Sequence, residues 1–333
     1  MKKSNGKKWI AIAIAILLFV ASSLVKTKSN EVTEKESEKI AQKYLGSFNP
    51  FSSTANKNII EGSDTSKKIA VITYKGAIGD GPVYDAVMER LKEVKEDDTV
   101  RGVILKVNSP GGAVYNSEQV ANKIKEIQKD KKIPVFTVME TMAASGGYYI
   151  SAPTDRIYAS NETLTGSIGV IMSSMSFQGL FEKYGIKQQN ITTGKMKDAG
   201  SSGKDMTDEQ KKYFQDLINS SFDRFIKLVS QGRSMKEDDV RKLADGRVYD
   251  GAQALENGLV DKIGNFDTAL ADMKKEYKLD NPQVYEYSDE MAPFSKLLSK
   301  GQALIGKDSK SDLAILKDLM DKDSPVPMYY YGK

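Results

Sequence analysis

The stretch Gly102-Val-Ile-Leu-Lys-Val-Asn-Ser-Pro-Gly-Gly112 decides the fold, because a buried strand runs here directly into a glycine-rich turn. Apolar runs of the same kind lie on both sides of it, at Ile69–Tyr74 and Pro134–Met139. Helical spacing of apolar residues separates the three runs, over Val83–Lys95 and Ala113–Gln128. The alternation of strands and helices predicts βαβ units, so we expect an α/β fold whose parallel-rich sheet has helices on both faces.

Further elements follow the third strand. Short strands are predicted at Arg156–Ala159, Ser167–Met172 and Ile186–Thr192. The residues Thr207-Asp-Glu-Gln210 form a capping box, which predicts that a long amphipathic helix begins here. Three shorter helices are predicted at Glu237–Leu243, Gly251–Glu256 and Asp267–Tyr277. We therefore expect one folded domain over residues 68–290.

The chain of 333 residues has neither cysteine nor histidine. This composition excludes cysteine nucleophiles, thiolate zinc sites and every catalytic triad that uses histidine. We expect neither a metal ion nor another cofactor, and a catalytic base must be a lysine, a tyrosine or a carboxylate. The net charge of +4 equals the charge of the four lysines at positions 2, 3, 7 and 8. The rest of the chain is neutral, which argues against a nucleic-acid partner.

The amino-terminal segment is expected to anchor the protein in a membrane. Residues 9–25 contain no charged side chain and follow a basic segment over residues 1–8. A helix of this length spans roughly 26 Å, close to the thickness of about 30 Å of a bilayer core. The positive-inside rule keeps residues 1–8 in the cytoplasm and places the domain outside the cell membrane, behind a polar stalk over residues 26–67. The alternative is a secretory signal that is cleaved near Ala21-Ser22-Ser23.

Residues 291–333 are predicted to form a carboxyl-terminal extension with an aromatic tail. The tail, Pro325-Val-Pro-Met-Tyr-Tyr-Tyr-Gly-Lys333, is apolar and spaced by prolines. Chain ends of this kind commonly have no fixed structure, and that interpretation is the simpler one. An extended apolar segment is also suited to lie along a substrate cleft, which is the more specific hypothesis.

Three stretches are candidates for an active site, because each follows a predicted strand and open α/β sheets bind ligands there. Two of them are glycine-rich turns, and the third is the lysine-containing segment 193–202. In Asn108-Ser-Pro-Gly-Gly112, the backbone amides are suited to hold an oxyanion. In Met142-Ala-Ala-Ser-Gly-Gly-Tyr-Tyr149, Ser145 is suited to act as a nucleophile, with the amide of Gly146 beside the same oxygen. The structural alternatives are an ordinary strand-to-helix turn and a serine that caps a helix.

A lysine is the most direct base for a serine in a chain without histidine. The segment Thr193-Gly-Lys-Met-Lys-Asp-Ala-Gly-Ser-Ser202 and its surroundings offer lysines at positions 195, 197 and 204. A lysine in a loop is usually only solvated. To act near neutral pH, burial must lower a lysine pKa from about 10.4, and a hydroxyl must orient the amine. Ser167, in Thr165-Gly-Ser-Ile-Gly169, is suited to that role unless it only forms a tight turn. The residues alone leave open which lysine is the base.

Four stretches, in this order, resemble the motifs of the signal peptide peptidase A family, in its single-domain Gram-positive form. They are Asn108–Gly112, Ala144–Tyr148, Leu164–Val170 and Gly194–Gly200, and the resemblance covers roughly residues 68–280. It implies a ClpP/crotonase-like fold. It also implies a membrane-anchored serine endopeptidase that degrades remnant signal peptides, and other peptides or unfolded proteins, with a Ser-Lys dyad.

The resemblance also implies a role for individual residues. Ser145 matches the nucleophile, Lys197 matches the general base, and Ser167 matches the hydroxyl that orients the base. The amides of Gly112 and Gly146 match the oxyanion hole. Longer members of the family hold two such domains in one chain, with the base in one and the nucleophile in the other. A single-domain chain is therefore expected to form a ring-shaped homo-oligomer whose neighbours share each dyad, and the alternative is a dyad within one chain.

Two other functions remain open from the sequence. Crotonase-type acyl-CoA enzymes share the expected fold and the oxyanion glycines, although they are typically soluble and commonly use acidic residues. A non-catalytic exported scaffold at the membrane would need neither Ser145 nor a lysine base. Hydrolysis of a peptide by the wild-type chain, and not by Ser145→Ala, separates a peptidase from both.

Overall fold

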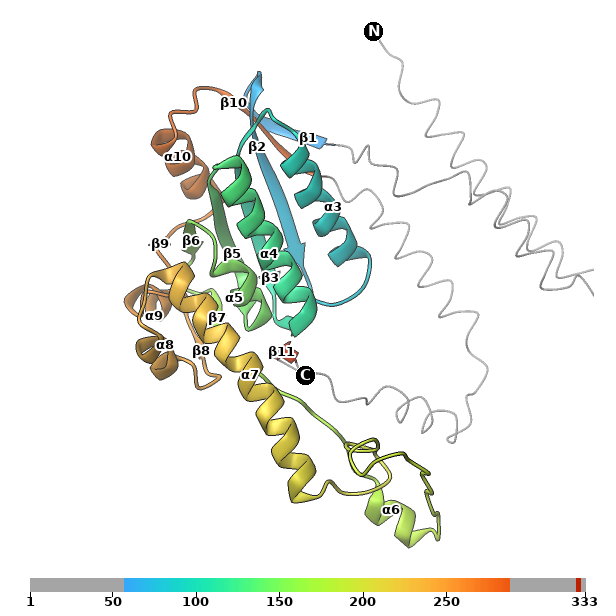
Figure 1. Ribbon diagram of the computed structural model, residues 1–333. Helices are drawn as coiled ribbons and strands as arrows, with labels where there is room; N and C mark the ends of the chain where they lie inside the picture. Colours follow the sequence, from blue (N-terminus) through green and yellow to red (C-terminus); the bar gives the residue numbers. More distant parts are fainter. Residues whose placement is uncertain (1–56, 288–327, 331–333) are drawn as a thin grey trace, which may run out of the picture. The chain divides into compact units, whose positions relative to one another are not determined.

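The computed structural model describes residues 57–287 and 328–330, and a nine-stranded sheet forms its centre (Figure 1). The strands are β1 (Lys57–Glu61), β2 (Asp64–Lys75), β3 (Val100–Ser109), β5 (Val135–Ala144), β6 (Arg156–Ala159), β7 (Leu164–Gly166), β8 (Val248–Tyr249), β9 (Lys262–Ile263) and β10 (Pro282–Tyr287). Strands β10, β2, β3, β5, β6 and β9 are parallel in that order, and β1 pairs antiparallel with β10 at one edge. The predicted α/β fold with a parallel-rich sheet is therefore confirmed.

Helices cover both faces of this sheet. Figure 1 shows α3 (Pro82–Glu96) and α4 (Val114–Lys131) side by side over one face. Helix α10 (Phe266–Glu276) packs on the other face, where Ile69 and Val71 of β2 join its buried side chains in one core cluster. Successive residues of a strand point to opposite faces, so the continuous apolar runs of the central strands supply both layers.

The sheet begins earlier in the sequence than the apolar pattern indicates. Strand β1 and the start of β2 lie within residues 57–67, which we expected to belong to the polar stalk. These residues are therefore part of the folded sheet. The side chains of β1 are exposed along its whole length, and its pairing with β10 holds it in place. Backbone pairing at an edge leaves no apolar pattern in the sequence, and this is why the strand was missed.

Two of the predicted strands are wrong. Residues 167–172 contribute only an isolated bridge at Ile171, because Ser167 has a φ of 49° and the chain leaves the sheet there. The short strand β7 (Leu164–Gly166) precedes this turn. Residues 186–192 have no regular structure and lie on the surface, away from any strand that they could join. Apolar residues at Ile186 and Ile191 had suggested a strand, but both side chains are exposed.

The longest helix, α7 (Asp208–Arg233), begins at the predicted capping box. The segment that precedes α7, residues 172–207, contains α6 (Gln178–Lys183), and we call it the arm. Figure 1 shows the arm at the end of α7 that is remote from the sheet. The remaining helices are α5 (Gly146–Ser151), α8 (Glu237–Leu243) and α9 (Gly251–Glu256), and the last two match their predicted bounds.

The expected membrane anchor over residues 9–25 lies outside the described residues, as do residues 1–8 and most of the expected stalk. Within residues 57–287, no helix combines the length and the apolar composition that a membrane span requires.

The capping box at the start of α7 gives a test of the fold. The Thr207 hydroxyl accepts from the N–H of Gln210 at 3.3 Å, and the Gln210 side chain accepts from the N–H of Thr207 at 3.1 Å. We expect Thr207→Ala to lower the free energy of unfolding by about 1 kcal/mol, because a helix amide loses its partner. Urea unfolding measures this, and Thr207→Ser, which keeps the hydroxyl, is the matched control. Equal stability of the two variants would contradict the interpretation.

Candidate active site

The first candidate turn joins β3 to a short strand, β4 (Gly111–Ala113). Gly111 has a φ of 99°, a conformation that glycine adopts without strain. On one side of β4, the N–H of Ile78 donates to Gly111 O at 2.8 Å and the N–H of Ala113 donates to Ile78 O at 2.7 Å. Because backbone groups alternate along a strand, the N–H of Gly112 points to the opposite side.

Ser145 lies where β5 ends and α5 begins. Its backbone has a φ of 54° and a ψ of −113°, which is strained for a residue with a side chain. The N–H of Ser145 donates to Gly166 O at 2.8 Å, and Ser145 O accepts from the N–H of Tyr149 at 2.8 Å. A sharp turn between a strand and a helix is also how hydrolases present a nucleophilic serine. The simpler interpretation fails, because Ser145 makes no capping hydrogen bond with its side chain.

The two glycine-rich turns lie against each other. A Cβ added to Gly146 would stand 3.0 Å from the backbone N of Gly112, and a Cβ added to Gly111 would stand 2.6 Å from the N of Gly146. A Cβ on Gly112 would stand 1.8 Å from Ile78 O. Only glycine therefore permits this contact, and the amides of Gly112 and Gly146 lie together beside Ser145.

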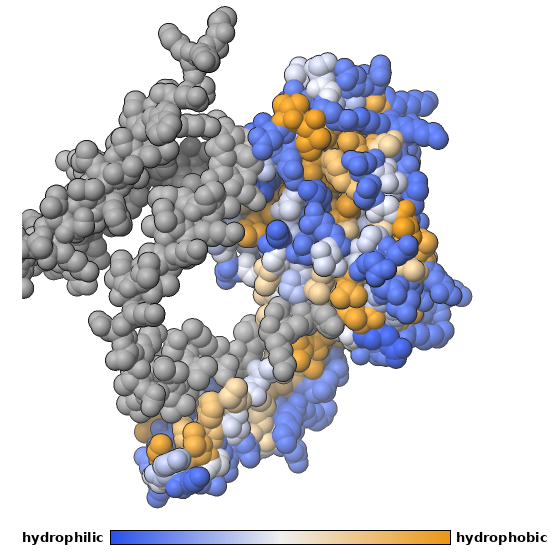
Figure 2. Space-filling view, turned by 180° about the vertical axis from the view of Figure 1, so that it is seen from behind, coloured by the Kyte–Doolittle hydropathy of each residue, from blue (hydrophilic) through white to orange (hydrophobic). Residues whose placement is uncertain are grey.

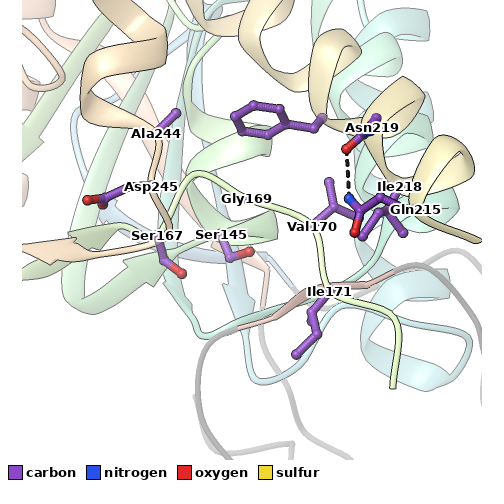
Figure 3. A pocket seen from close by; sticks show the side chains of 12 residues that line it. Ser145, Ser167, Gly169, Val170, Ile171, Gln215, Ile218, Asn219, Ala244 and Asp245 are labelled. Carbon is purple, nitrogen blue, oxygen red and sulfur yellow. Dashed lines mark hydrogen bonds between the residues drawn. The ribbon is translucent and has the colours of Figure 1, made fainter. Parts of the chain in front are cut away.

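Ser167 lies next to Ser145 because their strands are neighbours. Ala144 of β5 pairs with Gly166 of β7, so the serine that follows each of them stands at the same edge. Figure 3 shows both side chains at one cavity. The positive φ of Ser167 is held by its N–H, which donates to Arg247 O at 2.8 Å. The structure thus brings together Ser145, Ser167, Gly112 and Gly146.

The cavity beside the two serines has a volume of about 420 Å³. One wall is the middle of α7, where Gln215, Ile218, Asn219 and Phe222 face the cavity (Figure 3). The Gln215 amide donates to the Asn219 side-chain oxygen at 2.8 Å. Sequence reasoning missed this wall, because the apolar spacing of α7 was interpreted as a core face only. Within the described part of the chain, no three acidic side chains gather closely enough to hold a metal ion.

Lys197 does not reach this cavity in the same chain. Its side chain is exposed on the arm, between α6 and α7, and it does not line the cavity. The neighbouring Lys195 pairs with Glu209 in the first turn of α7. From Glu209 to Gln215, the first residue of α7 that lines the cavity, the helix rises about 9 Å, and neither Lys195 nor Lys197 lines the cavity. The structure therefore separates Lys197 from the other four predicted site residues.

Charged neighbours distinguish the lysines of the arm. Lys195 is paired with Glu209, and Lys204 donates to Asp198 at 2.6 Å. The hydrogen bond from Lys204 holds the pKa of the Asp198 carboxyl below its usual value. The carboxylate next to Lys197 in sequence is thus engaged elsewhere. Among the described residues, the amine of Lys197 has no hydrogen-bond or ion-pair partner.

The aromatic tail contributes a strand to the cleft. Strand β11 (Met328–Tyr330) pairs antiparallel with β4, with Tyr329 opposite Gly112. Its other edge contacts Ile171, which exchanges two backbone hydrogen bonds with Met328 at 2.8 and 3.0 Å. Residues 328–330 therefore lie as an extended strand beside the predicted oxyanion amides. This agrees with the more specific of the two hypotheses for the tail.

Comparisons with known proteins agree with this geometry. The sequence profile of peptidase family S49 matches residues 127–280, and that of Clp protease matches residues 59–164. A protein of Enterococcus faecium, named provisionally as signal peptide peptidase SppA, is 37% identical over an alignment 346 residues long. The alignment covers 98% of this chain and 99% of the relative.

Other relatives match a smaller share of this chain. Protease 4 of Haemophilus influenzae is 36% identical over 63% of this chain, and the match spans 35% of that protein. The chloroplastic serine protease SPPA of Arabidopsis thaliana is 30% identical over 77% of this chain and 39% of the relative. These matches favour a peptidase over an acyl-CoA enzyme or a non-catalytic scaffold. The near full-length match and the serine and glycine turns lead to one conclusion: the chain belongs to the signal peptide peptidase A family of S49 serine peptidases.

Proposed function

We propose that this protein degrades remnant signal peptides, and other peptides or unfolded proteins, with a Ser145–Lys197 dyad that neighbouring chains of a ring-shaped homo-oligomer share. One observation carries the proposal. Ser145, Ser167 and the amides of Gly112 and Gly146 converge in one cleft, whereas Lys197 of the same chain is exposed on the arm. One chain thus has a nucleophile and an oxyanion hole, and its base serves another chain.

In the proposed reaction, a peptide lies between β4 and Ile171 in the place of β11. The Ser145 hydroxyl oxygen attacks the carbonyl carbon while the uncharged Lys197 amine of a neighbour accepts the hydroxyl proton. The amides of Gly112 and Gly146 donate to the oxyanion. The lysine then gives its proton to the leaving nitrogen as the C–N bond breaks, and an ester remains on Ser145. The same amine activates the water that hydrolyses this ester.

Ser167 is proposed to position the incoming amine. Its side chain borders the same cavity as Ser145, and its hydroxyl makes no side-chain hydrogen bond among the described residues (Figure 3). Gln215 and Asn219 line the same cavity, and their polar side chains suit the polar backbone of an entering loop. A lysine that enters here loses most of its water, which favours the uncharged amine that catalysis needs.

The surface of the arm supports contact with a second copy. Figure 2 shows hydrophobic side chains gathered near the end of the arm. The exposed apolar residues of this segment are Met175, Leu180, Tyr184, Ile186 and Ile191. A group of this kind is unusual on a monomer and common at protein interfaces. A contact that places each arm on the next chain is heterologous, and it closes only as a ring.

The proposed location is the cell membrane. Residues 9–25 would cross it once, with residues 1–8 in the cytoplasm and the catalytic domain outside the cell. This placement follows from the sequence alone, and it would bring the cleft close to the membrane in which remnant signal peptides are left.

The identity of the base gives the first test. We expect Lys197→Ala to lower kcat/KM for a fluorogenic peptide by about a thousandfold or more, as for other groups that act as a unit with the nucleophile. Lys195→Ala, which removes a lysine already paired with Glu209, is the matched control and should change kcat/KM by less than about tenfold. Ser145→Ala sets the background. Near-normal turnover by Lys197→Ala would reject the dyad.

Mixed oligomers test whether the dyad is shared. Ser145→Ala and Lys197→Ala chains are each expected to be inactive alone. After joint unfolding and reassembly at a 1:1 ratio, about a quarter of the sites should combine an intact serine with an intact neighbouring lysine. We therefore expect roughly a quarter of wild-type activity. If native mass spectrometry shows mixed oligomers and no activity returns, the dyad lies within one chain.

A further inference from the structure

Two acids stand where they could keep the proposed base charged. A carboxylate near an amine stabilises the ammonium form, which cannot accept a proton. Asp198 directly follows Lys197 in the sequence. Asp245 lines the cavity that holds Ser145 and Ser167, which the lysine of a neighbouring chain would enter (Figure 3). What each carboxylate contacts therefore matters for the base.

The carboxyl group of Asp198 contacts the arm and not the base. Lys204 donates to Asp198 Oδ2 at 2.6 Å, and the Asp198 side chain is only 16% exposed, so water screens this pair incompletely. The hydrogen bond from Lys204 is the main cause that holds the pKa of Asp198 below its usual value, and the side chain of Asn190 adds to it. Asp198 is thus ionised, and Lys204 compensates its charge.

Asp245 is compensated in the same way. The Nε of Arg247 donates to both carboxylate oxygens of Asp245, at 2.8 Å each. The hydrogen bond from Arg247 also holds the pKa of Asp245 below its usual value. Figure 3 shows the Asp245 carboxyl group directed away from Ser145. Of the described residues that line the cavity, Asp245 alone carries a charge, and that charge has a partner.

The other acids near the lysine loop are engaged as well. Glu209, in the first turn of α7, pairs with Lys195. Asp205 accepts a hydrogen bond from the Ser176 hydroxyl within the arm. The carboxylates of the lysine loop and of the cavity that would receive it are therefore all bound by groups other than the Lys197 amine, as far as the described residues extend.

We propose that Lys204 and Arg247 are positioning residues for the base: each holds a carboxylate away from the Lys197 amine, so that the amine can be uncharged and accept the proton of Ser145. The inference rests on the proposed function and assigns two further residues to it. Lys204 acts in the chain that supplies the lysine, and Arg247 acts in the chain that receives it. Loss of either cation frees a carboxylate, which then stabilises the ammonium form of Lys197.

The pH dependence of kcat/KM for a fluorogenic peptide tests this on the full-length oligomer. The value should rise toward alkaline pH as the amine loses its proton. We expect Lys204→Met and Arg247→Met each to move the midpoint of this rise upward by about one pH unit. At neutral pH, kcat/KM then falls about tenfold, whereas at strongly alkaline pH it stays close to wild type. Lys204→Arg, which keeps a cation beside Asp198, is the matched control and should keep the wild-type midpoint.

Two double variants separate the effect of charge from an effect on structure. Lys204→Met with Asp198→Asn removes both charges of one pair, and Arg247→Met with Asp245→Asn removes both charges of the other. Neither double variant has a freed carboxylate, so we expect the midpoint to return to its wild-type position in both. A purely structural role for the pairs would lower kcat/KM by the same factor at every pH, and the second substitution would not reverse that loss.

The outcomes are distinct. An unchanged midpoint in Lys204→Met or in Arg247→Met would overturn the assignment of that residue, as would a loss that is equal at every pH. A double variant that keeps the displaced midpoint would do the same, and each of these results leaves the peptidase intact. Near-normal turnover by Lys197→Ala, or no wild-type hydrolysis above the Ser145→Ala background, would overturn the proposed function instead.

Discussion

The close approach of the Gly111–Gly112 backbone to the amide of Gly146 is the contact on which the cleft depends. It joins the end of β3 to the start of α5 across the middle of the sheet, and any side chain at these positions would collide with backbone or with Ser117. The same contact leaves Ser145 in a strained conformation with its N–H bonded to Gly166. Strain of this kind persists only where the surrounding structure holds it, and here it presents a hydroxyl beside two amides.

Helix α7 connects the functions that the cleft requires. Its middle forms a wall of the cavity, Phe225 further along packs against Tyr329, and Glu209 in its first turn pairs with Lys195 on the arm. The same helix therefore lines the cavity beside Ser145 and begins next to the arm that carries Lys197. Under the proposed mechanism, the lysine on this arm reaches a serine only in another chain, so catalysis would depend on assembly.

The sequence predicts some of this arrangement and not the rest, for physical reasons. Apolar runs and the Thr207 capping box predicted the parallel sheet and α7, because both patterns depend on local spacing. The two glycine-rich turns predicted that Gly112, Ser145 and Gly146 lie near one another, since parallel strands end at one edge. The place of Ser167 beside them was implied by the family resemblance. The packing of Tyr329 between Tyr149 and Phe225 could not be predicted, because both look like ordinary core residues until the tail is placed. Strand β1 has exposed side chains throughout, so its sequence shows no alternation of apolar and polar residues.

The central claim is that Ser145 and Lys197 meet only between chains, and a cross-link tests it most directly. The chain has no cysteine, so thiols introduced by Ser145→Cys and Lys197→Cys are the only ones present. We expect a short bis-maleimide to join the double variant into a ladder of covalent multimers on a denaturing gel, while each single variant stays monomeric. A double variant that reacts fully and still runs as a monomer would place both residues in one site of one chain and contradict the shared dyad.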